Sequence, residues 1–88
     1  MWAIAGPGST RMLADYGATV VRVETSHRFD ACRTVGPFHN GRPGGESSGL
    51  FYNMNAGKHP FSVDLSKPEG RAIILDLVRW ADVVTESF

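Results

Sequence analysis

The sequence predicts an α/β fold in which helices flank a largely parallel sheet, and three observations lead to this prediction. Short segments rich in β-branched residues alternate with segments whose apolar residues recur at helical spacing. The order is two β-α-β units separated by one long segment rich in glycine and proline, residues 25–47. With 88 residues, the chain has room for one domain at most.

The chain begins with a short apolar lead, residues 1–4, which we take as the end of a strand. Residues 5–8 have the sequence Ala-Gly-Pro-Gly and predict a turn. A helix is expected over residues 9–17, because Ser9 can serve as its N-cap and Gly17 suits the left-handed conformation that ends helices.

The next element is a strand over residues 18–24, where four of seven residues are β-branched. Val21 and Val23 fall on one face and Arg22 and Glu24 on the other, which is the alternation of a half-buried strand. Glu24 follows the glycine-rich turn by about 18 residues, near the place of a ribose-binding acid in dinucleotide folds. We prefer to interpret Glu24 as a solvated strand end.

Residues 25–47 lose all periodicity and are far longer than the usual connection, so they predict a loop that is either functional or disordered. Residues 48–54 are compatible with one helical turn. Residues 61–65 alternate apolar and polar side chains, which predicts a short strand.

The last third of the chain contains the clearest helical pattern. Ser66 is the expected N-cap, Pro68 lies near the first helical position, and Glu69 complements the positive end of the helix. The apolar residues at helical spacing are Ile74, Leu77, Val78 and Ala81. Residues 82–86 then predict another strand.

Composition excludes several classes of function. Nine basic residues balance nine acidic ones, so no large basic face for nucleic acid is expected. No apolar run approaches the roughly 20 residues that span a bilayer, and no membrane association is expected. The single cysteine, Cys32, cannot form an internal disulfide, which predicts a reducing, cytoplasmic compartment. His27, His39 and His59 are too far apart to predict a metal site.

Residues able to carry chemistry are few. The glycine-rich turn lacks the third glycine of a dinucleotide fingerprint, and Pro7 removes a donor, so a plain turn is favoured over an anion site. Cys32 lies near Arg33 but has no base at a recognisable spacing, which favours a thiol without a catalytic role. No serine lies in a Gly-x-Ser-x-Gly elbow. Lys58 and Lys67 flank the third predicted strand, and either could meet a phosphate or simply be solvated.

Five blocks of sequence occur in order over nearly the whole chain. They are Ala5-Gly6-Pro7, residues 13–24 (LADYGATVVRVE), Asn55 with Lys58, residues 63–71 (VDLSKPEGR) and residues 81–88 (ADVVTESF). Together they resemble the N-terminal portion of the class III CoA-transferase family, which includes formyl-CoA and carnitine CoA-transferases and the α-methylacyl-CoA racemases.

The resemblance implies part of a Rossmann-like domain that binds coenzyme A, within a ring-shaped, interlocked homodimer. It implies transfer of coenzyme A from an acyl-CoA to a carboxylic acid through an aspartate nucleophile. That aspartate belongs to a segment beyond the equivalent of Phe88, so no catalytic residue and no activity are expected in residues 1–88 alone. We expect these residues to be the N-terminal part of the domain, truncated at both ends.

The resemblance also implies where coenzyme A is contacted. The matching positions are Ile4, Ala5, Val63, Asp64, Leu65, Ser66, Lys67, Ser87 and Phe88. Thr25 stands where some members place an arginine for the phosphates. Because ligands of open α/β sheets bind outside the carboxyl ends of the strands, we expect residues 4–6 and 63–66 to converge on one edge of the sheet.

Two alternatives to CoA transfer remain. One is racemisation of a 2-methylacyl-CoA, whose acid and base groups would also lie downstream of Phe88. The other is a non-catalytic fragment that binds a nucleotide or a partner.

Overall fold

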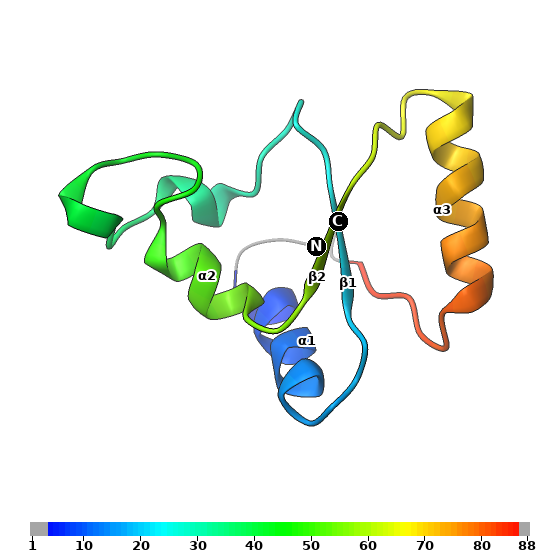
Figure 1. Cartoon of the computed structure of the whole chain (residues 1–88), viewed down its shortest axis with the longest axis horizontal. Helices are drawn as coiled ribbons and strands as arrows, with labels where there is room; N and C mark the ends of the chain where they lie inside the picture. Colours follow the sequence, from blue (N-terminus) through cyan, green and yellow to red (C-terminus); the bar gives the residue numbers. More distant parts are fainter. Residues whose placement is uncertain (1–3, 87–88) are drawn as a thin grey trace.

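The computed structural model describes residues 4–86 and arranges them as helices around a small parallel sheet (Figure 1). The α/β class predicted from the sequence is confirmed. The elements in order are α1 (Ala5–Asp15), β1 (Val21–Glu24), the 3₁₀ turns η1 (Ala31–Thr34) and η2 (His39–Gly41), α2 (Gly49–Asn55), β2 (His59–Ser62) and α3 (Pro68–Trp80). In the view of Figure 1, α2 and α3 lie on either side of the strands.

The sheet is one parallel pair, with Val21 opposite His59 and Val23 opposite Phe61. Backbone hydrogen bonds extend the pairing at both ends, from His59 N to the Val20 oxygen (2.8 Å) and from Val63 N to the Glu24 oxygen (3.0 Å). Parallel neighbours need a long crossover, and here residues 25–58 provide it through η1, η2 and α2. The predicted long loop therefore contains ordered turns.

Helix α1 begins at Ala5, so the prediction that residues 5–8 form a turn and that Ser9 caps the helix is wrong. Gly8 N already donates to the Ile4 oxygen at 2.7 Å, which is a full helical turn. Pro7 is tolerated because the first amides of a helix have no intrahelical acceptor. Ser9 instead donates its hydroxyl back to the Gly6 oxygen (2.8 Å). The lead strand expected over residues 1–4 lies largely outside the described residues.

The N-cap that the sequence analysis missed is Ser48, at the start of α2. Its Oγ accepts a hydrogen bond from Phe51 N (3.2 Å). The same Oγ lies 2.6 Å from the carbonyl oxygens of Cys32 and Val35 and can donate its proton to one of them. Because Ser48 is completely buried, this hydroxyl joins α2 to η1 and fixes the end of the crossover loop.

Helix α3 begins at Pro68, as predicted, but Lys67 and not Ser66 occupies the N-cap position. Ser66 turns back and bonds the Asp64 carboxylate through both its amide (2.9 Å) and its hydroxyl (2.7 Å). Gly70 is buried because the helix packs directly on the backbone that precedes it. A Cβ on Gly70 would lie 2.1 Å from the Asp64 carbonyl oxygen.

The strand predicted over residues 82–86 does not form, and this prediction is wrong for the described chain. Val83 is 73% exposed and Val84 is 61% exposed. A strand requires a neighbour to satisfy its backbone groups, and neither β1 nor β2 pairs with this segment. Strand-like sequence alone therefore does not produce a strand here.

The two serines provide a matched test of the capping assignment. Ser48→Ala removes a cap and two buried contacts, so we expect the free energy of unfolding to fall by about 1–3 kcal/mol. Ser9→Ala removes an exposed hydroxyl and should cost less than about 0.5 kcal/mol. Urea denaturation followed by circular dichroism compares the two, and equal losses would contradict the assignment.

A second pair of substitutions tests the packing of α3 against the backbone of residue 64. Gly70→Ala forces a methyl group into the Asp64 carbonyl, so we expect destabilisation of about 1–3 kcal/mol. Gly45→Ala is the control, because a Cβ there meets no atom within 4 Å. Thermal melts of both variants are the measurement. A Gly70→Ala protein as stable as the control would show that α3 does not pack on residue 64.

Candidate functional site

A cleft of about 560 Å³ lies against the sheet, on the side occupied by η1 and α2. Its volume is within the range of small-molecule sites, roughly 300–1,000 Å³. Residues at the carboxyl ends of both strands line it, including Glu24, Thr25 and Ser62. Open α/β sheets bind ligands at this end of their strands. Aromatic side chains supply much of the remaining wall, and these are Phe29, Phe51, Tyr52 and Phe61.

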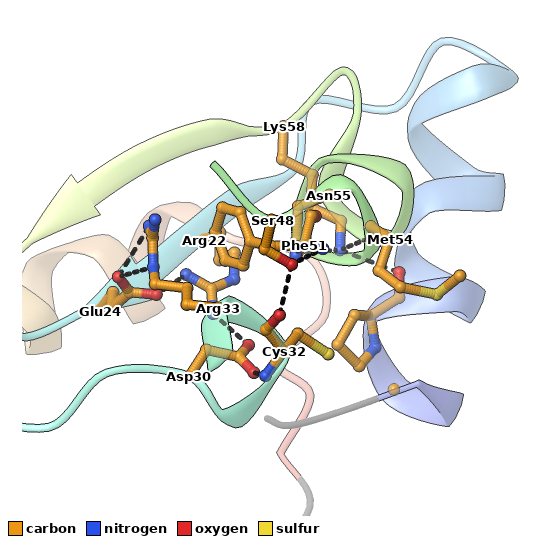
Figure 2. Close-up of polar contacts among 12 residues, drawn as sticks. Arg22, Glu24, Asp30, Cys32, Arg33, Ser48, Phe51, Met54, Asn55 and Lys58 are labelled. Atoms are coloured by element: carbon orange, nitrogen blue, oxygen red, sulfur yellow. Dashed lines mark hydrogen bonds and ion pairs between the residues drawn. The ribbon is translucent and has the colours of Figure 1, made fainter. Parts of the chain in front are cut away.

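One wall of the cleft is a network of charged side chains (Figure 2). Arg22 of β1 donates to Glu24 and to Asp30, the latter at 2.5 Å. Arg33 of η1 donates to the same Glu24 carboxylate at 2.9 Å. Asp30 is only 1% exposed, and the other three side chains are also largely buried. Their charges balance, so the network forms a neutral frame for the cleft.

The Phe51 ring explains how two guanidinium groups come close together. The Arg33 guanidinium carbon lies 3.7 Å from the ring centroid and that of Arg22 lies 4.8 Å away. The negative face of an aromatic ring attracts cations, so Phe51 stabilises both arginines. Glu24 is therefore not the solvated strand end that the sequence suggested, but the shared acceptor of two cations.

Cys32 is buried next to this network and joins it through its backbone amide. Its amide donates to the Asp30 carboxylate at 2.8 Å, which caps η1. Burial, followed by the nearby Asp30 charge, raises the pKa of the Cys32 thiol. A raised pKa keeps the thiol protonated at neutral pH and makes it a poor nucleophile. This agrees with the interpretation of Cys32 as a residue without a catalytic role.

Lys58 joins the start of α1 to the end of α2, a role that the sequence did not suggest. Its Nζ donates to the carbonyl oxygens of Pro7 (2.9 Å) and Met54 (3.1 Å) and to Asn55 Oδ1 (2.9 Å). Burial, with a contribution from the Arg22 charge, lowers the pKa of Lys58 to about 8. Asn55 and Lys58, paired in the sequence blocks, thus form a structural link between helices.

The predicted CoA contacts at residues 63–67 form one turn beside the end of β1. Lys67 N donates to the Asp64 oxygen at 3.3 Å, closing the turn. His27 Nε2 approaches the Asp64 carboxylate at 3.6 Å. The hydrogen bonds from Ser66, assisted by the charges of His27 and Lys67, lower the pKa of Asp64. Sequence analysis had treated His27 only as a loop residue.

The other predicted CoA contacts lie elsewhere or outside the described residues. Ile4 is exposed at the start of α1, and its oxygen accepts from Gly8 N within the helix. Ala5 is the first residue of α1 and is also exposed. The convergence of this segment with residues 63–66 stays a prediction. Ser87 and Phe88 lie outside the described residues.

Residues 4–86 lack two other features, a metal site and a membrane-spanning helix. Within this range no group of three His, Cys, Asp or Glu side chains is placed to hold a metal ion. No helix in the same range has both the length and the apolar character needed to cross a membrane.

Taken together, the described residues form part of an α/β domain, with a ligand-sized cleft at the carboxyl ends of a parallel strand pair. The family model of CoA-transferase family III matches residues 1–88. The chain belongs to this family, as the five sequence blocks had indicated.

Individual relatives agree with the family match. The chain is 44% identical to the succinate–glutarate CoA-transferase of Agrobacterium fabrum, over 97% of the chain and 22% of that protein. It is 41% identical to the succinyl-CoA:mesaconate CoA-transferase of Haloarcula hispanica, over 97% of the chain and 21% of the relative. It is 34% identical to the human succinyl-CoA:glutarate CoA-transferase, over 97% of the chain and 18% of that protein. The chain thus spans about a fifth of the length of these relatives. No solved structure matches it significantly.

The lowered pKa of Lys58 predicts a pH dependence of stability. Because the folded-state pKa, about 8, is below the ordinary value of about 10.4, the unfolded chain binds more protons between these values. The free energy of unfolding should therefore rise as the pH increases from about 7 to about 8.5. Chemical denaturation across this interval is the measurement, and ionisation of the Cys32 thiol in the unfolded chain, whose ordinary pKa is about 8.5, opposes the rise mainly near its upper end.

Lys58→Met is the variant that isolates this effect. It removes the titrating group and should flatten the slope, whatever it costs in absolute stability. An identical slope in the wild-type protein and in Lys58→Met would show that another group is responsible.

Proposed function

We propose that the chain forms part of the CoA-binding domain of an enzyme that transfers coenzyme A from an acyl-CoA to a carboxylic acid. The observation that carries this proposal is the family match over residues 1–88, together with relatives named as CoA-transferases at 34–44% identity. Since the chain spans about a fifth of these relatives, the reaction is proposed for the enzyme of which these residues form a part.

The turn at residues 63–67 is the proposed recognition site for the nucleotide end of coenzyme A. Lys67 brings a positive charge to the edge of the sheet, and His27 Nε2 adds a hydrogen-bonding group beside Asp64, a combination that suits phosphate oxygens. The Asp64 carboxylate, kept ionised by its neighbours, can accept a hydrogen bond from a ribose hydroxyl. Ile4 and Ala5, at the start of α1, and the chain end at Ser87 and Phe88 are proposed to complete the contacts.

The cleft beside this turn suits the less polar parts of the ligand. Phe29 and Phe61 line it and offer flat apolar surface to an adenine ring or a pantetheine chain. The arginines of the wall already bind Glu24 and Asp30, so they are not the proposed phosphate ligands. Phosphate recognition is therefore assigned to the turn and apolar packing to the cleft.

The aspartate nucleophile is proposed to belong to a segment beyond the equivalent of Phe88, as the family resemblance implies, and not to the carboxylates beside the cleft and the turn. Asp30 is buried and paired with Arg22, and Asp64 is occupied by Ser66. A nucleophile must be accessible and unpaired to attack a thioester carbon. The chain's proposed part is to bind and orient coenzyme A, within a cytoplasmic homodimer of Rossmann-like domains.

Among the alternatives, racemisation has less support than transfer, because the relatives compared above are all named as CoA-transferases. A purely non-catalytic role is supported only by the short length of the chain.

The test is binding of coenzyme A to the 88-residue chain. Lys67→Ala should weaken binding by about 1 kcal/mol, or about fivefold in Kd, because it removes one exposed cation from the phosphates. The control is Arg79→Ala, which also removes an exposed cation, one that pairs with Asp76 at the other end of α3. Titration followed by ¹H–¹⁵N NMR measures both affinity and location. Shifts confined to residues away from 25–27 and 63–67, or equal effects of both variants, would contradict the proposed site.

A further inference from the structure

Glu46 makes an unusual contact at the rim of the cleft. Its carboxylate accepts a hydrogen bond from Arg33 Nη1 at 3.1 Å and lies 3.4 Å from the Tyr52 hydroxyl. Although it is held by two groups that line the cleft, the Glu46 side chain is 81% exposed. A largely solvated carboxylate therefore occupies the position between a cleft arginine and a cleft phenol.

The partners of Arg33 differ in how firmly they are held. Its Nε and Nη2 bind Glu24, which is largely buried, and its plane packs on Phe51. Its Nη1 donates to the Gly45 carbonyl at 2.7 Å and to Glu46. Arg33 itself is only 11% exposed. The guanidinium group is thus fixed in place by Glu24, Phe51 and Gly45, while the bond to Glu46 can exchange with solvent.

An exposed ion pair of this kind contributes little to stability, because water competes for both charges. Loss of the Glu46 side chain from Arg33 leaves the Gly45 bond intact, so the loop need not unfold for the carboxylate to leave. A rigid guanidinium N–H beside a phenol hydroxyl is a recognition set for carboxylates. The adjoining cleft, about 560 Å³ with Phe29 on its wall, has room for a short aliphatic acid.

We infer that Arg33 Nη1 and the Tyr52 hydroxyl form a carboxylate-binding subsite, which Glu46 fills as a displaceable internal ligand and which accepts a short-chain carboxylic acid in its place. The inference rests on the proposed function in one respect only, which is that the carboxylic acid bound here belongs to the class that accepts the coenzyme A. The subsite lies in the cleft and is separate from residues 63–67, the proposed phosphate site.

The experiment titrates the 88-residue chain with succinate at constant ionic strength and follows ¹H–¹⁵N NMR shifts. Glu46→Gln removes the competing carboxylate, and we expect succinate to bind about two- to fivefold more tightly, the strength of one exposed ion pair. Glu69→Gln is the control, since it makes the same change of charge on exposed α3 and should leave the affinity unchanged. Succinamide, which has no carboxylate, should cause no shifts in the cleft.

A third variant tests the other partner. Tyr52→Phe keeps the ring and removes only the hydroxyl of a half-exposed side chain, so it should fold and weaken succinate binding. The inference is overturned if Glu46→Gln and Glu69→Gln bind succinate equally, or if the shifts lie outside residues 33, 45–46 and 51–52. Coenzyme A titration of the same samples separates the two proposals. If succinate binds and coenzyme A does not, the proposed function is contradicted and the carboxylate subsite is supported. If coenzyme A binds and Glu46→Gln has no effect on succinate, the subsite is contradicted and the proposed function is supported.

Discussion

The Glu24 carboxylate accepts hydrogen bonds from both Arg22 and Arg33, and the rest of the fold depends on this interaction. It brings the end of β1, the η1 turn and α2 together, because both guanidinium groups also lie over the Phe51 ring. A largely buried charge is costly unless it is paired and hydrogen-bonded. The two carboxylates and two arginines satisfy this condition together, and none of them would do so alone.

This network takes the place of a large apolar core. Among the described residues, the buried hydrophobic side chains are those of Cys32 and Phe51, whereas Thr10, Asp30 and Ser48 are buried polar residues. Polar contacts are directional, so they fix the geometry of the crossover loop more tightly than apolar contact alone. The cost is that much apolar surface stays uncovered, including Trp80 of α3.

The pairing of the two arginines with Glu24 and Asp30 also gives the cleft and the neighbouring turn different electrostatic character. Because the cleft arginines are neutralised internally, they frame a cavity without making it strongly basic. The exposed cation that is proposed to meet the ligand is instead Lys67, in the turn at residues 63–67, where His27 also approaches Asp64. Under the proposed function, one edge of the sheet would recognise the phosphates of coenzyme A and the adjoining cleft would hold apolar and carboxylate groups.

The sequence by itself determined the α/β class and the presence of β1, α2 and α3, because β-branched runs, helical spacing and the Pro68 start are local signals. The family followed separately, from the resemblance of the five ordered sequence blocks. The sequence misplaced the cap of α1 and predicted a strand at residues 82–86, since a cap and a strand depend on what lies beside them. It also could not show that Glu24, Asp30, Arg33 and Ser48 meet. These residues lie within a loop without periodicity or at its two ends, and only the tertiary structure brings them near Phe51, where burial forces each charge and hydroxyl to find a partner.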